Sequence, residues 1–336
     1  MAVRVGINGF GRIGRLVLRA LIESGRKDIE VVGLNDLGPV ETNAHLLRHD
    51  SVHGKFPHAV KVAGDTIDAG LGPMKVTAIK NPAELPWKEL KVDIAFECTG
   101  LFTAREKASA HLTAGARRVL ISAPGEGADL TVVYGVNEDK LTKDHIIVSN
   151  ASCTTNCLGP VASVMHKAVG IEQGFMTTIH SYTGDQPTLD TFHKDLYRAR
   201  AAALNIIPTS TGAAKAIGLV IPELKGKLDG SSMRVPTPNV SLVDFKFTSK
   251  KATSVEEINN AVMEAAKSDR LAKILTWTKE PLVSSDLNHD SHSATFAVDQ
   301  TKVIDGHFVR VVAWYDNEWG FSNRMADTAA AMAKFA

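Results

Sequence analysis

Residues 3–15 read VRVGINGFGRIGR, and this stretch decides the fold expected for the N-terminal part of the chain. The apolar run at residues 3–7 predicts a buried strand, and an amphipathic helical pattern follows over residues 12–24. Between them, Gly9, Gly11 and Gly14 have the spacing G-x-G-x-x-G. Glycines at these positions allow a tight turn and close packing of the helix on the strand. The amides of the first helical turn are then directed at an anion.

Further short runs rich in Val and Ile follow this first unit, with helical stretches between them. They lie at residues 29–34, 92–98, 118–122, 131–134 and 145–149, with a predicted helix at 104–114. Such alternation is typical of a parallel sheet covered on both faces. Together with the glycine spacing, it predicts an α/β Rossmann dinucleotide-binding domain. Residues 65–80 are expected to form an inserted antiparallel piece.

Asp36 ends the second predicted strand, where a carboxylate can bond the hydroxyls of an adenosine ribose. A carboxylate there repels a 2′-phosphate, so NAD is favoured over NADP. A glycine-rich turn followed by a chance Asp is the alternative, which the strand–turn–helix context disfavours.

Beyond residue 150 the pattern changes to that of an α+β catalytic domain with a mostly antiparallel sheet. Predicted elements are a helix at 153–169, a strand at 174–180, a long loop at about 181–210, a helix at 211–219, strands at 240–247, 294–299 and 307–314, and a final helix at 323–334. Ser254 and Glu257 form a capping box that opens a helix to about Lys267. Asp305-Gly306 is a hairpin signal, with the strand at 294–299 leading toward it. We expect residues 1–151 and 317–336 to form the first domain and residues 152–316 the second.

Composition excludes several classes of protein. The 336 residues include 38 Lys+Arg and 37 Asp+Glu, so neither nucleic acid nor a membrane is an expected partner on electrostatic grounds. No run approaches the roughly 18 apolar residues of a membrane span, and a strand so near the N-terminus leaves no room for a signal peptide. Three cysteines do not make a disulfide framework, which suits a reducing, cytoplasmic setting.

Cys153 falls in the first turn of a predicted helix within the segment SNASCTTNC, residues 149–157. The helix dipole there lowers a thiol pKa and favours a nucleophilic thiolate, although a small buried hydrophobe is the common role of a free Cys. Cys98 and Cys157 are interpreted as structural, and no metal site is expected.

His180 ends a predicted strand before the long loop, which favours it as a base over the other histidines. Thr211-Gly212 begins a helix and is either an ordinary cap or a phosphate site. Arg198, Arg200 and Arg234 are guanidinium candidates for phosphate oxygens.

Taken together, these motifs resemble the glyceraldehyde-3-phosphate dehydrogenase family over nearly the whole chain. The segments that carry the resemblance are residues 7–15, 149–156, 205–208, 211–215, 234–240 and 314–318. The resemblance implies phosphorylating, NAD-dependent oxidation of D-glyceraldehyde 3-phosphate to 1,3-bisphosphoglycerate in glycolysis or gluconeogenesis, through a hemithioacetal and a thioester. It also implies a homotetramer, with the loop after His180 at a subunit interface.

The resemblance also implies a role for each matched residue. Cys153 is the nucleophile and His180 the base. The cofactor-binding residues are Gly9, Gly11, Arg12, Ile13, Gly14, Asp36, Lys80, Ser122 and Asn317. Thr183 and Arg234 hold the substrate phosphate, and Asp185 positions Arg234. Ser152, Thr154, Thr211 and Gly212 hold inorganic phosphate, and Arg198 lies between the two.

Three positions depart from the commonest family pattern. Lys80 stands where Arg is frequent, Phe321 where many relatives have Tyr, and Phe192 where bacterial relatives often have Pro. Two other functions remain open at this point. One is erythrose-4-phosphate dehydrogenase, with the same chemistry on a longer aldehyde. The other is a nucleotide- or RNA-binding protein without catalysis, which the near-neutral charge disfavours.

Overall fold

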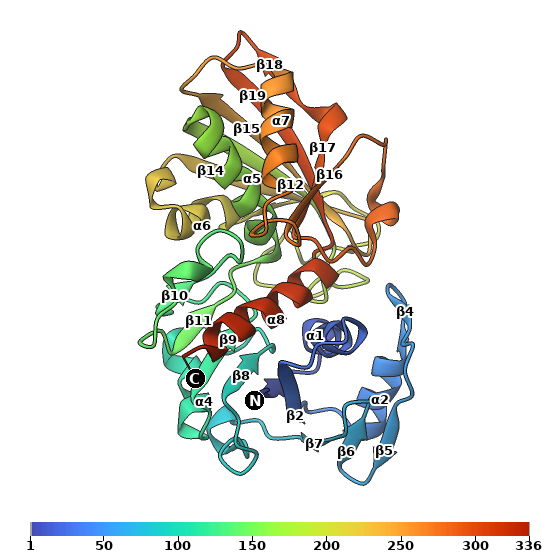
Figure 1. The fold of residues 1–336 in the computed structure, drawn as a ribbon. Coiled ribbons are helices and arrows are strands. Elements are labelled where there is room, and N and C mark those ends of the chain that lie inside the picture. The colour runs from blue at the N-terminus through green and yellow to red at the C-terminus, as the bar shows by residue number, and fades with distance from the viewer. Residues whose placement is uncertain (1, 336) are drawn as a thin grey trace. The chain divides into compact units, whose positions relative to one another are not determined.

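A nine-stranded sheet forms the centre of the first of two units in this computed structural model, which describes residues 2–335 (Figure 1). Unit 1 comprises the described residues up to Val132, Glu138–Ser152, and those from Ser322 onward. The strand order is β10-β11-β9-β8-β1-β2-β7-β6-β5. These strands are β1 (Val3–Asn8), β2 (Ile29–Asn35), β5 (Lys61–Ala63), β6 (Thr66–Asp68), β7 (Pro73–Thr77), β8 (Ile94–Glu97), β9 (Arg118–Ile121), β10 (Leu130–Thr131) and β11 (Ile147–Ser149).

The strands from β10 to β7 are all parallel, whereas β6 pairs antiparallel with both β7 and β5. The inserted antiparallel piece expected at residues 65–80 is therefore confirmed. Helix α1 (Arg12–Glu23) follows β1 directly and α2 (Val40–Arg48) follows β2; a short two-stranded ribbon, β3 (His49–Asp50) and β4 (Gly54–Lys55), comes after α2. Because β1 and β8 are apolar over most of their length and both are fully buried at their centres, the sheet forms the core of the unit.

Two predictions for unit 1 are wrong in detail. The helix expected at 104–114 is divided into α3 (Arg105–Ala108) and α4 (Ala110–Thr113), at Ser109, whose hydroxyl donates to the backbone oxygen of Glu106 at 2.6 Å. The strand expected at 131–134 ends at Thr131. After it, the Asn137 side chain accepts the backbone N–H of Val133 at 2.8 Å and closes a turn.

Unit 2 comprises residues 133–137 and 153–321 and contains an eight-stranded, mostly antiparallel sheet. The order is β13-β14-β12-β15-β19-β17-β16, with β18 also on β19. The strands are β12 (Ile171–Ser181), β13 (Ile207–Ser210), β14 (Leu228–Val235), β15 (Ser241–Ser249), β16 (Leu275–Thr278), β17 (Ala294–Ala297), β18 (Lys302–Ile304) and β19 (Phe308–Tyr315). The fold class predicted from the sequence is thus confirmed. The turn at Asp305-Gly306, however, joins β18 to β19, not the strand at 294–299.

Helices α5 (Cys153–Val169), α6 (Ala213–Val220) and α7 (Val255–Ala265) pack on this sheet or on each other. Strand β15 alternates strictly, with Val243, Phe245 and Phe247 buried and the residues between them half-buried. The capping box of Ser254 and Glu257 is present at the start of α7. Helix α8 (Trp319–Ala333) ends the chain. No helix among residues 2–335 is long and apolar enough to span a membrane.

Candidate active site

A cavity of about 510 Å³ in unit 1 opens at the carboxyl ends of β1, β2 and β8. It is lined by Asn8, Gly9, Gly11, Asn35, Asp36, Leu37, Ile79, Lys80, Cys98, Thr99, Leu101 and Phe102. Ligands of open α/β sheets bind at this edge. Of the residues predicted for the cofactor, Gly9, Gly11, Asp36 and Lys80 line the cavity.

The glycine turn is built for close approach. A Cβ at Gly14 would lie 2.0 Å from the backbone oxygen of Gly9, and one at Gly9, whose φ is +91°, would lie 2.7 Å from the Thr99 nitrogen. Gly11 is the N-cap of α1 and brings no side-chain cap, and the first turn holds no acidic residue. The helix start therefore suits a diphosphate. Asp36 accepts the backbone N–H groups of Phe10 at 2.8 Å and Gly38 at 3.0 Å, which hold its carboxylate at the cavity.

The remaining cofactor candidates lie elsewhere. Arg12 and Ile13 are in the first turn of α1, and the Arg12 guanidinium pairs with Asp50 at 2.6 Å. Ser122 follows β9 and donates its backbone N–H to the backbone oxygen of Glu97. Asn317 belongs to unit 2, where its Oδ1 accepts from the Ser181 and Ser241 hydroxyls at 2.9 and 2.8 Å. The sequence reasoning missed Asn8, Asn35 and Thr99; the rule that parallel sheets bind at their carboxyl edge was the signal that could have found them.

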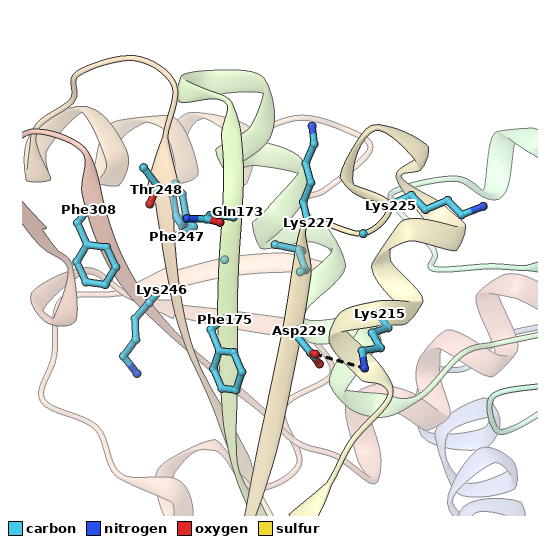
Figure 2. A pocket seen from close by; sticks show the side chains of 13 residues that line it. Gln173, Phe175, Lys215, Lys225, Lys227, Asp229, Lys246, Phe247, Thr248 and Phe308 are labelled. Carbon is cyan, nitrogen blue, oxygen red and sulfur yellow. Dashed lines mark ion pairs between the residues drawn. The ribbon is translucent and has the colours of Figure 1, made fainter.

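In unit 2, the Cys153 and His180 side chains meet. Cys153 is the first residue of α5, His180 is next to last in β12, and Sγ lies 3.5 Å from Nε2. The pairing predicted from sequence is therefore in contact range. A second cavity, of about 740 Å³, lies at the other end of β12 and contains neither residue (Figure 2).

Hydrogen bonds determine which imidazole nitrogen carries the proton. The backbone oxygen of Ser181 is 2.7 Å from His180 Nδ1. A backbone oxygen can only accept, so Nδ1 is the protonated nitrogen. Arg234 Nη1 lies 3.1 Å from the same Nδ1, but its two hydrogens are accounted for by the Ser181 oxygen at 3.0 Å and the Thr183 hydroxyl at 3.1 Å. The lone pair of Nε2 is consequently the group that faces the Cys153 sulfur.

The electrostatics correct one expectation from the sequence. Burial raises the pKa of the Cys153 thiol; Arg234 and hydrogen bonds from Thr154 oppose this without reversing it. The predicted lowering of the thiol pKa by the helix start is therefore wrong, because desolvation exceeds it. Burial, and then the Arg234 guanidinium, lower the pKa of His180 from 6.5 to about 3. The resting pair is thus a thiol beside a neutral imidazole.

Cationic groups gather around this pair. Arg198 donates to Asp185 at 3.0 Å and to the Thr209 hydroxyl at 3.1 Å, and Asp185 also accepts from the Thr183 hydroxyl. Burial and the neighbouring Arg198 lower the pKa of Arg234, whose buried Nε has no partner. An anion beside the two guanidinium groups would offset the repulsion between their positive charges and would accept a hydrogen bond from Arg234 Nε. The cluster therefore suits a phosphate.

The other phosphate candidates are placed as follows. Thr211 accepts the backbone N–H of Ala213 at 3.2 Å, and Gly212 is the N-cap of α6 without a side-chain cap. Ser152 precedes α5 directly. The Thr154 hydroxyl is buried, 2.8 Å from the hydroxyl of Tyr315, so its contacts are with the sulfur and Tyr315. Tyr315, which also lies edge-on to the His180 ring, was not predicted.

The three departures from the family pattern differ in setting. Lys80 lines the cavity of unit 1, Phe321 is buried in unit 2, and the Phe192 side chain is 95% exposed on the long loop.

Comparison with known families gives two matches. Residues 3–105 match the model of the glyceraldehyde 3-phosphate dehydrogenase NAD-binding domain, and residues 152–317 that of its C-terminal domain. Among curated relatives, glyceraldehyde-3-phosphate dehydrogenase of Xanthobacter flavus is 73% identical over 334 residues, and that of Cereibacter sphaeroides is 69% identical over the same length. The protein of that name from Geobacillus stearothermophilus is 55% identical. Each alignment covers 99% of both chains.

Proposed function

The chain belongs to the glyceraldehyde-3-phosphate dehydrogenase family, and we propose that Cys153 and His180 carry out its phosphorylating oxidation of D-glyceraldehyde 3-phosphate. The observation that carries these roles is the 3.5 Å contact between Cys153 Sγ and the unprotonated Nε2 of His180. An imidazole within hydrogen-bond reach of a thiol is the arrangement of an activated nucleophile.

NAD is the cofactor, and the residues of unit 1 fit it. The glycine turn and the start of α1 suit its diphosphate, and Asp36 suits its adenosine ribose. Lys80 supplies a cation at the same cavity. We propose that Arg12, Ile13, Gly14, Ser122 and Asn317 complete the cofactor contacts. When bound, NAD accepts a hydride at C4 of its nicotinamide ring.

The first step forms a carbon–sulfur bond. Because the thiol pKa is raised, the sulfur attacks as its proton passes to His180 Nε2. His180 then returns the proton to the aldehyde oxygen, which gives a hemithioacetal on Cys153. The hydrogen bond from Nδ1 to the Ser181 oxygen supports the imidazolium during this exchange.

The second step is oxidation. His180 removes the hydroxyl proton of the hemithioacetal while the hydride leaves the same carbon, and a thioester remains on Cys153. Phosphate then attacks the thioester carbon, the carbon–sulfur bond breaks, and 1,3-bisphosphoglycerate is released. His180 gives its proton to the departing sulfur, and the proton of the attacking phosphate goes to solvent.

Two anions must be held for this sequence. We assign the substrate phosphate to Thr183 and Arg234, with Asp185 and Arg198 beside them. The inorganic phosphate is assigned to Ser152, Thr211 and Gly212, near the starts of α5 and α6, where backbone amides favour anions.

The test is an assay of NADH formation from glyceraldehyde 3-phosphate. The unaltered chain should require NAD and phosphate, accept arsenate in place of phosphate, and give little product with NADP. Cys153→Ser should bind NAD but lose phosphorylating turnover by several orders of magnitude. Near-normal turnover of that variant would refute the assignment. Erythrose 4-phosphate, assayed in parallel by kcat/KM, measures the preference for the shorter aldehyde.

We further propose a homotetramer, for which two exposed surfaces of unit 2 argue. On the sheet face, Phe175 pairs in register with Lys246, and Phe308 pairs with Thr248, so these side chains share one face (Figure 2). Phe175 and Phe308 are exposed there. On the long loop, Leu189, Phe192 and Leu196 are 73, 95 and 82% exposed. Apolar surface of this kind marks an interface.

Sedimentation equilibrium measures this assembly directly. The unaltered chain should have four times the monomer mass, and Leu196→Asp should shift it toward smaller species. A monomer at micromolar concentration would contradict the proposal. The three free cysteines suit a reducing compartment, and we propose the cytoplasm as the location.

A further inference from the structure

A chain of buried polar side chains lies at the carboxyl ends of the central strands of unit 1. Its centre is Glu97, the last residue of β8, whose side chain is fully buried. The Glu97 carboxylate contacts Asn8 Nδ2 at 2.7 Å, His111 Nε2 at 2.9 Å and the Thr99 backbone nitrogen at 2.8 Å, and it also accepts from the Thr99 hydroxyl. No step of the reaction described above uses this carboxylate.

The direction of each hydrogen bond on the Asn8 side follows from backbone groups. The backbone N–H of Ile79 can only donate, so the Asn35 side-chain atom 2.9 Å from it must be the oxygen Oδ1. The backbone oxygen of Ile79 can only accept, and it lies 2.9 Å from Asn35 Nδ2. That Nδ2 also donates to Asn8 Oδ1 at 2.8 Å. Asn8 therefore directs its Nδ2 toward Glu97. Rotating either side-chain amide by 180° would place one N–H donor against another.

The direction on the His111 side is equally determined. The Trp87 indole Nε1 can only donate, and it lies 3.0 Å from His111 Nδ1, so Nδ1 accepts and Nε2 carries the hydrogen. The Thr99 hydroxyl accepts the N–H of Leu101 at 3.0 Å, so its own hydrogen goes to Glu97. Four donors thus converge on two oxygens, and three of them, from Asn8, His111 and the Thr99 backbone, cannot become acceptors.

We propose that Glu97 is a positioning residue for NAD. Its partners Asn8 and Thr99 line the cofactor cavity. So do Asn35, which is bonded to Asn8, Ile79, which is bonded to Asn35, and Leu101, which is bonded to Thr99. Glu97 thereby holds three parts of the cavity wall in one arrangement without touching the cavity itself. The proposal rests on the assignment of NAD to this cavity.

Glutamine cannot replace Glu97 in this setting. Its single oxygen would satisfy either the Asn8 and His111 pair or the Thr99 pair. Its NH₂ group would then face the Thr99 backbone N–H on one side, or the Asn8 and His111 donors on the other. Ile79 and Trp87 fix the Asn8 and His111 donors, and the Thr99 backbone N–H can only donate, so local flips cannot relieve the mismatch. The wall around Asn8 or Thr99 must then move, which weakens cofactor binding.

Calorimetric titration of Glu97→Gln with NAD and with ADP-ribose tests this. We expect both dissociation constants to rise about tenfold or more, the loss of one or two buried hydrogen bonds. At saturating NAD, kcat and the KM for glyceraldehyde 3-phosphate should stay within about twofold, because unit 2 is untouched. The matched control is Val119→Ala, a fully buried residue of β9 outside the cavity lining, which should lower the melting temperature without changing either dissociation constant.

A second variant allows the proposal to be tested if Glu97→Gln does not fold. His111→Phe keeps a ring in place, removes one donor to Glu97, and lies outside the cavity lining. It should raise the NAD dissociation constant severalfold. Unchanged NAD affinity in whichever of these variants folds would overturn the positioning role. Failure of the unaltered chain to bind NAD or to form NADH would instead refute the proposed function, which separates the two outcomes.

Discussion

The replacement His180→Gln should reduce the loss of folding stability in mild acid. His180 is 4% exposed, and burial, then Arg234, lower its pKa from 6.5 to about 3. Between these two values the unfolded chain binds the proton that the folded chain excludes. The contribution of this group is therefore present above pH 6.5 and is lost as the pH falls toward 3. From pH 7.5 to 5.0, the linkage relation gives a loss of about 2 kcal/mol from this one side chain.

Urea unfolding of both proteins at pH 7.5, 6.5 and 5.0 measures the effect. The free energy of unfolding of His180→Gln should fall by about 2 kcal/mol less over this range than that of the unaltered chain, whatever its stability at pH 7.5. The matched control is His58→Gln, which removes an exposed imidazole from unit 1. Equal pH dependence in the unaltered chain and His180→Gln would refute the reasoning, because it would mean that the folded chain accepts the proton at His180.

The same variant tests the catalytic role. Loss of a positioned base costs about 10² to 10⁴ in rate, and a stopped-flow burst of NADH reports the acylation step. Because the pKa of His180 is about 3, the imidazole stays unprotonated in the unaltered chain at pH 6. The kcat/KM of acylation, which reports the free enzyme, should then show no acid limb from His180 above pH 5.

Two further substitutions test the assignments around the cofactor and the substrate. Arg234→Leu removes the guanidinium beside Thr183 and should raise the KM for glyceraldehyde 3-phosphate at least 30-fold, about 2 kcal/mol. The kcat/KM for unphosphorylated glyceraldehyde should change much less. Equal losses on the two aldehydes would contradict a phosphate-binding role of Arg234. Asp36→Asn removes the negative charge and keeps an oxygen for only one of the two amides, Phe10 or Gly38, that bond to the carboxylate, so the ratio of kcat/KM for NADP over NAD should rise about tenfold or more. An unchanged ratio would place the discrimination elsewhere.

Local signals predicted much of this structure correctly. The glycine turn between β1 and α1, the start of α5 at Cys153 and the capping box at Ser254 each depend on residues within a few positions of one another. Such features follow from the backbone conformations and local hydrogen bonds that these residue types favour, so they can be predicted from the sequence. The family resemblance then supplied the distant pairing of Cys153 with His180, which no local pattern contains.

Features that depend on burial and distant contacts were missed. The direction of the Cys153 pKa shift was wrong because the helix start is visible in the sequence whereas desolvation is not. Arg234 is 54 positions from His180, and Glu97 is 89 positions from Asn8. Polar networks of this kind are defined by strand register, so they become visible only when β1 and β8, or β12 and β14, lie side by side.

The cations of the site connect substrate binding to the strength of the base. Arg234 and Arg198 both lower the pKa of His180, and Arg234 is the larger of the two effects. A substrate phosphate bound between them opposes their field, so it raises the pKa of the imidazole as the aldehyde arrives at Cys153. A base that is weak in the free enzyme thus becomes stronger in the complex, where it must take a proton from a thiol whose own pKa is raised. The pH dependence of acylation with phosphorylated and unphosphorylated glyceraldehyde measures this difference. The apparent pKa of the base should be higher with the phosphorylated aldehyde, and identical profiles would show that the phosphate acts through binding alone.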